Sequence, residues 1–379
     1  MSLCHPIQLR HADWLPGVQA CSSCEYPPPV PISLKLRKDS LMNQPPGTFV
    51  RVQEAALLNF ATVCFEKAGL DHDHAALISR LLVNADLRGV RSHGTRTVNN
   101  YCRSFVEGAL NPKPEIRQVH ETPTSVIFEG DGTLGYLPMV RATEIAIAKA
   151  KQVGIGMGLV RYIGHYGSAG HYARMCMEAG CVGFSVQGWR NQGQQKTDGG
   201  GPNPGALLGY FGNPPICFAI PGGKDYPPVV LDAATCILAD DQRGPEFEAL
   251  FSMIPAAFFK SIGYGAVATL LGGALTGFTL SDETWGKYSA ARMGGMVLAI
   301  DIETVVPAAV FGAESDRLAR DIRTHYKPMP GNDESLLPGA VEEQIFALHR
   351  AEGIRYGEME QESARAASAR LGVPLPWEE

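Results

Sequence analysis

The sequence has few charged residues, and neither sign dominates. Of its 379 residues, 33 are Lys or Arg and 39 are Asp or Glu, which gives a formal net charge of −6. Nucleic-acid grooves and anionic membrane surfaces attract basic proteins, so neither is expected as a partner. With 45% hydrophobic residues, the chain is too apolar for a disordered protein, and its length fits two or three domains around a sizeable core.

The cysteines lack a regular pattern. There are nine, and an odd number at irregular spacing argues against a disulfide framework and favours a reducing, cytoplasmic compartment. Cys21 and Cys24 have the spacing of a redox or zinc pair, but no second pair follows. Chance is the better explanation, so no metal site is expected.

Long hydrophobic runs and nucleotide-binding motifs are also scarce. The N-terminal segment MSLCHPIQLRHADW lacks the apolar stretch of a signal peptide. The apolar run Gly263–Phe278 is shorter than the ~20 residues that span a bilayer. No G-x-x-x-x-G-K-[ST] pattern occurs. We therefore expect no signal peptide, no membrane span and no P-loop phosphoryl transfer.

Hydrophobic periodicity predicts an α/β chain with a substantial sheet. Residues 1–48 have little periodicity and contain a Tyr-Pro-Pro-Pro run, which indicates a poorly structured extension. Apolar residues then recur at helical spacing over 56–64 and 78–85, which predicts two amphipathic helices. Further strands are predicted at 125–128, 155–160, 182–186, 216–220, 229–231 and 296–302, and helices at 141–152, 168–179, 263–275 (buried), 343–352 and 359–371.

The segment Gly130–Gly135 fits G-x-G-x-x-G and lies between a predicted strand and a predicted helix. That is the setting of a dinucleotide-binding fingerprint. However, no acidic residue follows at ~20 residues, where the fingerprint needs one. A tight turn that uses the conformational freedom of glycine explains the same letters better.

Two histidines lie in glycine-flanked polar turns, His93 after Ser92 and His165 within Gly-His-Tyr-Gly. Imidazole has a pKa near neutrality, so both are candidates for acid/base chemistry, although each taken singly is more often structural. His165 and His171 are six residues apart and would point to different sides of a helix, which argues against a zinc pair. Ser92 and His93 would point apart in an extended segment, which argues against a hydrolase dyad.

Seven segments, among them ADLRGVRSHGTRTVNNY, GHYGSAGHYA and VVLDAAT, together resemble the type 2 malate/L-lactate dehydrogenase family. The resemblance covers about residues 50–375 and is specific because the segments run in the family's order. The segments are 85–101, 130–136, 146–173, 212–221, 229–235, 263–277 and 296–303.

The resemblance implies a non-Rossmann α/β fold with a mostly antiparallel mixed sheet surrounded by helices. Residues 49–120, completed by helices in 304–379, would form a helical domain, and residues 121–303 the sheet-containing nicotinamide-cofactor domain. This removes the fingerprint interpretation of Gly130–Gly135. Family members are usually homodimers that interconvert a small 2-hydroxy acid and its 2-keto acid with NAD or NADP.

The resemblance also assigns roles to individual residues. His165 corresponds to the family's acid/base histidine, and His93 to a second histidine proposed for proton transfer. Hydride transfer to a keto acid leaves an alkoxide, which a positioned imidazolium can protonate, while the cofactor supplies the hydride. The substrate-binding positions are Ser92, Tyr101 and Arg96, and the cofactor-binding positions are Asp232, Ala233, Ala234, Thr235, Gly263 and Gly339.

The sequence departs from the family mainly at cofactor positions. Thr97 replaces an arginine, Ile262 replaces a lysine, residues 236–262 form a shortened segment, and 188–213 is a glycine-rich insertion. Both histidines and Tyr101 are retained. Two alternatives therefore stay open: a lyase, isomerase or cyclase that uses the same histidine pocket without a cofactor, and a non-catalytic paralogue.

Overall fold

The computed structural model describes residues 45–189, 213–237, 245–328 and 333–377. The predicted extension therefore lies almost wholly outside the described residues, as does most of the glycine-rich segment 188–213. The strands are β1 Val50–Val52, β2 Arg117–Glu121, β3 Ser125–Glu129, β4 Ile155–Ile163, β5 Cys181–Trp189, β6 Pro215–Ile220, β7 Val229–Ala234, β8 Met293–Asp301 and β9 Ile354–Tyr356. The helices are α1 Glu54–Lys67, α2 His72–Leu87, α3 Val98–Val106, α4 Tyr136–Val153, α5 Gly170–Glu178, α6 Pro245–Met253, α7 Pro255–Gly272, α8 Asp282–Lys287, α9 Ala308–His325, α10 Ala340–Glu352 and α11 Glu358–Leu371.

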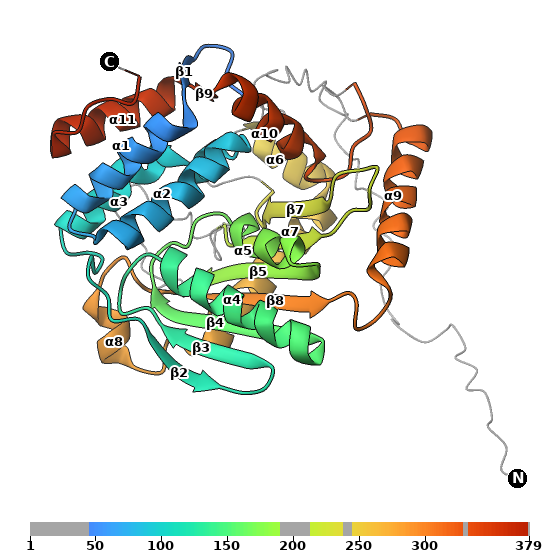
Figure 1. Ribbon diagram of the computed structural model, residues 1–379, viewed down its shortest axis with the longest axis horizontal. Helices are drawn as coiled ribbons and strands as arrows, with labels where there is room; N and C mark the ends of the chain where they lie inside the picture. Colours follow the sequence, from blue (N-terminus) through green and yellow to red (C-terminus); the bar gives the residue numbers. More distant parts are fainter. Residues whose placement is uncertain (1–44, 190–212, 238–244, 329–332, 378–379) are drawn as a thin grey trace, which may run out of the picture. The chain divides into compact units, whose positions relative to one another are not determined.

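The main sheet of the described residues has seven strands in the order β2-β3-β4-β8-β5-β6-β7 (Figure 1). Strands β3 and β4 are parallel, with α4 between them in sequence, and every other neighbouring pair is antiparallel. The short strands β1 and β9 form a separate antiparallel pair. The predicted α/β class, with a mostly antiparallel mixed sheet surrounded by helices, is confirmed.

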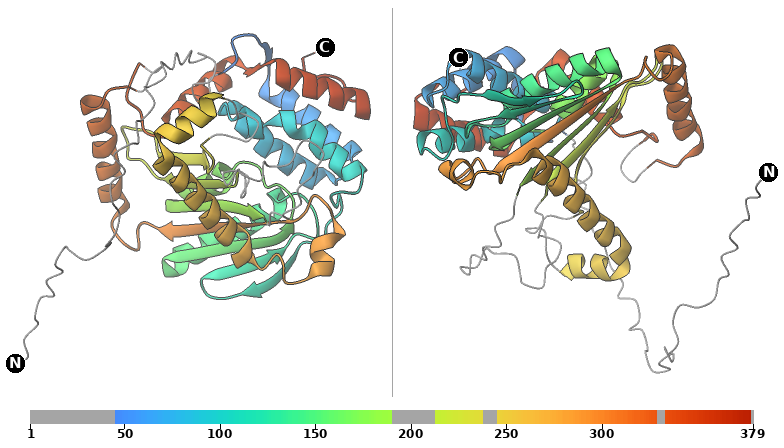
Figure 2. Two further views of the ribbon diagram at one scale, coloured as in Figure 1. Left: turned by 180° about the vertical axis from the view of Figure 1, so that it is seen from behind. Right: turned by 90° about the horizontal axis from the view of Figure 1, so that it is seen from below.

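Alternate residues of the central strands pack on opposite faces of this sheet. Val160 of β4 and Val297 of β8 belong to the core under α4 and α5. Leu159 and Met296, one residue earlier on each strand, belong to the core under α7. This follows from the two-residue side-chain period of a strand. Figure 2 shows α4 and α7 on opposite sides of the sheet.

Two glycines let α4 lie close to the sheet. A Cβ atom on Gly156 would lie 1.9 Å from the carbonyl oxygen of Ala146, and one on Gly158 would lie 2.6 Å from that of Ala142. Both contacts are too short for any side chain, so β4 approaches the helix backbone through its glycines. This packing fixes β4, and thereby the loop after it, which carries His165.

A second core joins segments from both ends of the described chain. Phe60 of α1, Ile78 of α2 and Phe105 of α3 share one buried cluster with Ile354 of β9 and Ala364 of α11. Figure 1 shows α11 beside α1. This cluster contains helices from both ranges predicted for the helical domain, while the domain boundaries themselves stay a prediction. Strand β2, four of whose five residues lie inside the range 49–120, belongs to the main sheet.

Helix α7 differs from its prediction as a buried helix over 263–275. It begins at Pro255, a residue favoured at the first position of a helix, and continues through Lys260. One flank faces outward, with Phe259 76% and Leu270 60% exposed. Within the described residues, Pro255–Thr276 is the one helical stretch long and apolar enough to cross a membrane, by length and composition only. The argument that the apolar run Gly263–Phe278 is too short to span a bilayer was therefore wrong, because the helical stretch is longer than that run.

The turn Gly130–Gly135 connects β3 to α4 and is filled by the chain's own side chains. Gly132 has φ +81°, and a Cβ atom there would lie 2.0 Å from the ring of Tyr288. On Gly135 it would lie 2.5 Å from Tyr166. No residue of this turn lines the cavity that His93 and His165 border. The interpretation as a tight turn is confirmed.

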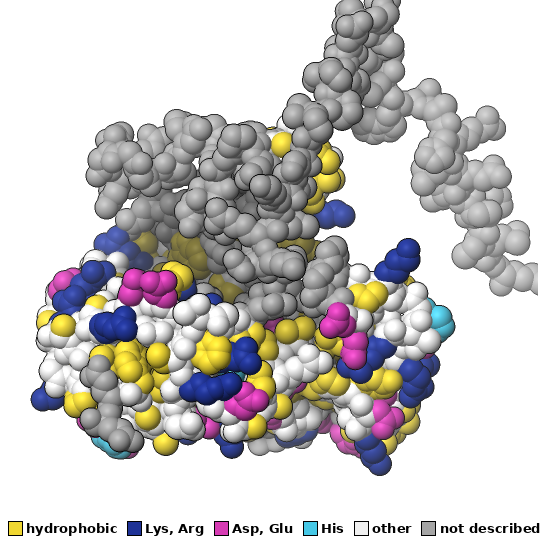
Figure 3. Space-filling view, turned by 90° about the horizontal axis from the view of Figure 1, so that it is seen from above, with side chains coloured by type: hydrophobic (Ala, Val, Ile, Leu, Met, Phe, Trp, Pro, Cys, Tyr) yellow, Lys and Arg dark blue, Asp and Glu magenta, His cyan; other side chains and the backbone are white. Residues whose placement is uncertain are grey.

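Charges of both signs are mixed on the visible surface. On the face drawn in Figure 3, basic and acidic side chains of the described residues lie interspersed among apolar ones. No block of one sign covers that part of the face, which agrees with the low net charge of the sequence.

Candidate active site

A cavity of about 370 Å³ lies where the end of α2, the β4–α5 loop and β7 meet. Its volume is within the range of small-molecule sites. The sequence-predicted residues Ser92, His93, His165, Asp232, Ala233 and Ala234 all line it. The structure thus brings together residues from three segments that are far apart in the sequence.

The two predicted histidines meet in this cavity. The rings of His93 and His165 are stacked, with centroids 5.4 Å apart and planes inclined by 28°. His93 lies in a 3₁₀ turn, Arg91–His93, and not in an extended segment as expected. In this turn the Ser92 hydroxyl lies 2.9 Å from His93 Nδ1, so the expectation that the two side chains point apart was wrong.

Tyr101 stands behind His165 and not in the cavity wall. Its hydroxyl oxygen lies 2.6 Å from His165 Nδ1, and the backbone N–H of Gly167 also donates to Nδ1, at 3.3 Å. A backbone N–H can only donate, so Nδ1 accepts and the proton of the neutral ring is on Nε2. This leaves Nε2 of His165 as the nitrogen available to a ligand in the cavity.

Burial keeps this group neutral near physiological pH. Burial, and secondarily the charge of His93, lowers the pKa of His165 to about 3. Burial also lowers the pKa of His93, although the carboxylate of Asp232 opposes this shift. Burial raises the pKa of Tyr101 to about 12, so its hydroxyl stays protonated. A pair of neutral imidazoles therefore faces the cavity.

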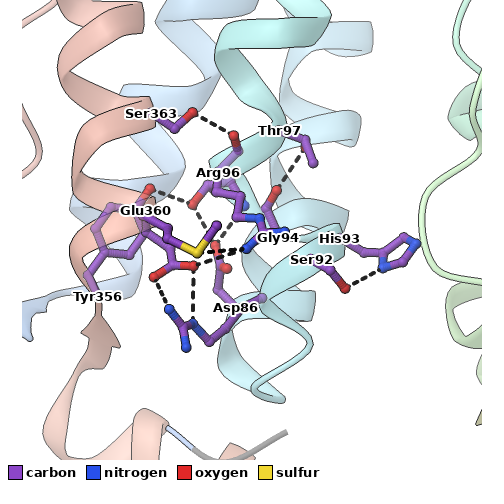
Figure 4. A network of polar contacts seen from close by, with 12 residues as sticks. Asp86, Ser92, His93, Gly94, Arg96, Thr97, Tyr356, Glu360 and Ser363 are labelled. Atoms are coloured by element: carbon purple, nitrogen blue, oxygen red, sulfur yellow. Dashed lines mark hydrogen bonds and ion pairs between the residues drawn. The ribbon is translucent and has the colours of Figure 1, made fainter. Parts of the chain in front are cut away.

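A buried polar network holds the turn that carries His93 (Figure 4). Asp86 accepts hydrogen bonds from the backbone N–H of Thr95 at 2.9 Å and from its hydroxyl at 2.6 Å. The Thr95 hydroxyl also lies 2.9 Å from that of Tyr356. A Cβ atom on Gly94 would lie 1.8 Å from an Asp86 oxygen. Only glycine fits between His93 and Thr95, because the carboxylate occupies the space.

The second part of this network ties the turn to α11. Glu360, which is 1% exposed, accepts hydrogen bonds from Arg91 Nε at 3.1 Å and from Arg91 Nη2 at 2.5 Å. Figure 4 shows Ser92 and His93 pointing away from Glu360. The network therefore fixes the backbone of the turn and leaves its two site residues free to face the cavity.

Arg96, predicted to bind substrate, does not line the cavity. Its guanidinium lies 3.9 Å from the Glu360 carboxylate and 3.8 Å from Met359 Sδ, and its carbonyl accepts a hydrogen bond from the Ser363 hydroxyl. The 3₁₀ turn Thr95–Thr97 directs it toward α11. The structure therefore contradicts the placement of Arg96 in the substrate pocket.

Asp232, predicted to contact the cofactor, is anchored at the start of α5. Its carboxylate accepts hydrogen bonds from the Ser168 hydroxyl and from the Gly170 N–H, the latter at 3.0 Å. Thr235, at the end of the same strand segment, donates its hydroxyl to the Pro214 carbonyl at 2.7 Å and does not line this cavity. It borders a second, largely apolar cavity of about 710 Å³, which Ala233 and Ala234 also border.

The remaining predicted cofactor residues lie outside the first cavity. Gly263 is on the exposed side of α7, where a Cβ atom would have no neighbour within 4 Å. Gly339 has φ +96° at the start of α10, where a Cβ atom would lie 2.9 Å from the N atom of Val230. Val230 does line the cavity, so Gly339 supports the wall from behind.

Among the cavity residues that sequence reasoning missed are Arg88, His171 and Arg174. His171 and Arg174 are three apart on α5, so they share one face of the helix. This spacing is the signal that could have paired them. Because His165 precedes α5, the helical argument that separated it from His171 does not apply, and both line the same cavity. Among the described residues, no group of three or more His, Cys, Asp or Glu is arranged to hold a metal ion.

Comparisons with known proteins show sequence similarity to dehydrogenases. The family model for malate/L-lactate dehydrogenase matches residues 52–243. A malate dehydrogenase of Pyrococcus horikoshii is 30% identical over 315 residues, 74% of this chain and 84% of that protein. A ureidoglycolate dehydrogenase (NAD(+)) of Escherichia coli is 26% identical over 76% of this chain and 87% of that protein.

Solved structures show the same fold. The structure of malate dehydrogenase from Pyrococcus horikoshii superposes with a TM-score of 0.72 at 25% identity, and covers 87% of this chain and 98% of that one. Sulfolactate dehydrogenase from Methanocaldococcus jannaschii superposes with a TM-score of 0.66 at 24% identity, and covers 86% of this chain and 98% of that one. Because the family model matches more than half of the chain and a relative is 30% identical over 74% of it, the chain belongs to the malate/L-lactate dehydrogenase family.

Proposed function

We propose that the protein is an NAD- or NADP-dependent dehydrogenase that interconverts a small 2-hydroxy acid and the corresponding 2-keto acid. The observation that carries this proposal is the convergence of His93 and His165 on one cavity, with Tyr101 hydrogen-bonded to His165 from behind. The names of the relatives, which include malate and ureidoglycolate dehydrogenases, support this reaction class.

The residues present fit a nicotinamide cofactor. The cavity next to the histidines has the size of a small-molecule site and a mixed polar and apolar lining. Ala233 and Ala234 border both this cavity and the second one, so β7 offers a wall along which a longer molecule than a small acid can extend. Asp232, Ala233 and Ala234 would hold the cofactor, and a bound nicotinamide supplies or accepts the hydride.

The chain's own residues move the proton. In reduction of a keto acid, the Nε2–H of His165 hydrogen-bonds to the oxygen on which negative charge develops. The imidazolium form, which the low pKa makes a minor species at neutral pH, donates its proton there and leaves the neutral ring. In oxidation, Nε2 takes the hydroxyl proton from the tautomer that carries its own proton on Nδ1, where it is donated to the Tyr101 oxygen. The Tyr101 hydroxyl can donate or accept, so it holds the ring in either tautomer. His93, stacked on His165, limits how the ring can turn.

Cofactor binding and turnover test this function separately. Purified protein should change the fluorescence of NADH or NADPH and should oxidise one of them with a panel of 2-keto acids. His165→Ala should retain the fluorescence change but lose turnover by about 10²–10⁴-fold. Proton-transfer turnover without cofactor binding would instead support the lyase, isomerase or cyclase alternative. Absence of both activities would support a non-catalytic paralogue.

We further propose that the protein is a cytoplasmic homodimer. Large apolar side chains are exposed along α6 and α7, among them Met253 (63%), Phe259 (76%) and Leu270 (60%). Exposed apolar patches of this kind mark interaction sites. Free thiols suit a reducing compartment, and the buried Cys64, Cys102, Cys176, Cys181 and Cys217 are free. Light scattering of the purified protein should give twice the mass of one chain, and Phe259→Glu should give the monomer mass. Flotation with liposomes would point to a membrane surface instead.

A further inference from the structure

Two arginines of the cavity share a single carboxylate. Arg88 follows the last turn of α2, and Arg174 lies on α5. Their Nη1 atoms lie 2.6 Å and 2.5 Å from the same oxygen, Oε1 of Glu343. Both guanidinium groups therefore share the charge of one close carboxylate, and the charge of Glu178 also acts on Arg88.

The cluster lies where little water reaches it. Arg174 is 8% exposed. Burial lowers the pKa of Arg88, and the positive charge of Arg174 lowers it further, against the opposing effect of Glu343. Buried like charges are costly unless an opposite charge compensates them. An anion in the cavity would supply this compensation.

His171 gives an independent indication of a ligand. It is 7% exposed, borders the same cavity, and its Nε2 atom is buried with no hydrogen-bond partner among the described residues. Burial, and then the charge of His93, lowers the pKa of His171 to about 3, so the ring is neutral. A buried ring nitrogen without a partner is costly, and an oxygen of a ligand can accept its proton.

The acidic residues of the cavity are Asp232 and Glu342. Asp232 already accepts hydrogen bonds from Ser168 and Gly170, which hold it at the start of α5. The basic cluster comes from the end of α2, from Arg174 of α5 and from Glu343 of α10, which also carries Glu342.

We propose that Arg88, Arg174 and His171 form a binding site for an oxyanion group, a carboxylate or a phosphate. The assignment of the group to a substrate or a cofactor rests on the proposed function, whereas the anion site itself does not. With Arg96 outside the cavity, Arg88 and Arg174 are the arginines of the described chain that line it. Arginine pairs suit this role because each guanidinium can donate two parallel hydrogen bonds to a carboxylate or phosphate.

Calorimetric titration of the purified full-length protein with oxalate and with inorganic phosphate tests the site without turnover. Arg174→Gln should weaken binding of at least one of these anions by about 10- to 100-fold, as expected for loss of a charge-assisted hydrogen bond. Glu343→Gln removes the competing carboxylate and should strengthen binding. Arg317→Gln is the matched control, because Arg317 forms its ion pairs on exposed α9, and it should leave binding unchanged.

Arg174→Gln should weaken anion binding and Glu343→Gln should strengthen it. These opposite effects distinguish an anion-binding role of the two arginines from a structural one. If the two arginines only stabilise the fold, both Arg174→Gln and Glu343→Gln will weaken binding or leave it unchanged, and the proposal is overturned. If Arg174→Gln does not fold, Glu343→Gln still decides, since tighter binding supports the site and weaker or equal binding overturns it. Circular dichroism of each variant checks the fold.

Two further measurements identify the source of the anion. A raised KM of Arg174→Gln for the keto acid at saturating cofactor assigns the site to a substrate carboxylate. A raised Kd for NADH or NADPH, measured by fluorescence, assigns it to a cofactor phosphate. Arg174-dependent anion binding in a protein that neither binds cofactor nor turns over would leave this site in place and remove the proposed function.

Discussion

The hydroxyl oxygen of Tyr101 lies 2.6 Å from Nδ1 of His165. Tyr101 comes from α3, which packs in the helical core, and His165 follows β4 of the main sheet. This hydrogen bond therefore links the two cores at the point where the proposed chemistry takes place. The orientation of the acid/base group depends on how the helical segment and the sheet pack together.

Loss of this hydroxyl should slow the reaction more than it weakens binding. Tyr101→Phe keeps the ring but removes the group that holds His165 Nδ1, so we expect kcat to fall by about 10-fold or more with a small change in KM. Steady-state kinetics measure both. Tyr326→Phe is the control, because Tyr326 is 66% exposed, and equal effects in the two variants would refute the role of Tyr101.

The pH profile should lack the inflection of an ordinary histidine. Burial places the pKa of His165 at about 3, whereas an unperturbed imidazole titrates near 6.5. The neutral ring that accepts the hydroxyl proton is then fully populated from pH 8 to pH 5. We expect kcat/KM for oxidation of the hydroxy acid to stay level over this range. A decline below a midpoint near 6.5 would show that His165 is not the base or is not buried.

Gly94→Ala should destabilise the protein, because the new Cβ atom would overlap with the Asp86 carboxylate. Asp86 would have to move and give up its hydrogen bonds to Thr95, at a cost of about 1–3 kcal/mol in the free energy of unfolding. Denaturant unfolding measures this. Gly286→Ala, in α8 with nothing within 4 Å of the added atom, should be neutral or slightly stabilising, and equal stability of both variants would contradict the packing.

The buried Asp86 should make stability depend on pH. Burial raises its pKa to about 7, against the opposing hydrogen bonds from Thr95, whereas in the unfolded chain it titrates near the ordinary value of about 4. The folded state therefore holds the proton more tightly, so its contribution is present below pH ~4 and is lost as the pH rises toward 7. Asp86→Asn cannot ionise.

The melting temperature of Asp86→Asn relative to the unaltered protein should therefore increase from pH 5 to pH 8. Thermal unfolding at both values checks this. Glu360 and Arg91 lie in the same network, so Glu360→Gln serves as a second variant that keeps Asp86. A constant difference between Asp86→Asn and the unaltered protein would show that Asp86 does not titrate in this range.

Several elements followed directly from local patterns. The central strands β4, β5 and β8 are rich in apolar β-forming residues, and α2 and α4 repeat apolar residues at helical spacing. These patterns arise because burial of one face of a strand or helix places apolar residues at regular spacing among sequence neighbours. Strand β2 was missed because all five of its residues are exposed, so they show no burial pattern. Charges on such a strand are common at a sheet edge.

Only part of the candidate site could be predicted from the sequence. Ser92, His93, His165 and Asp232 were identified through family motifs, which record short segments around each residue. Arg96 was wrongly placed because the direction of a side chain in a 3₁₀ turn depends on what packs beside it, here Glu360 on α11. No local pattern marks a contact between residues more than 260 positions apart.

The sequence by itself determined the class of the fold, the core strands and helices, and the histidines on which the proposed chemistry depends. Tertiary structure alone decided that Tyr101 contacts His165, that Arg88 and Arg174 share Glu343, and that Arg96 turns away from the cavity. The physical reason is that hydrophobic periodicity is a property of neighbouring residues, whereas a binding site depends on the packing of segments that the chain brings together only when it folds.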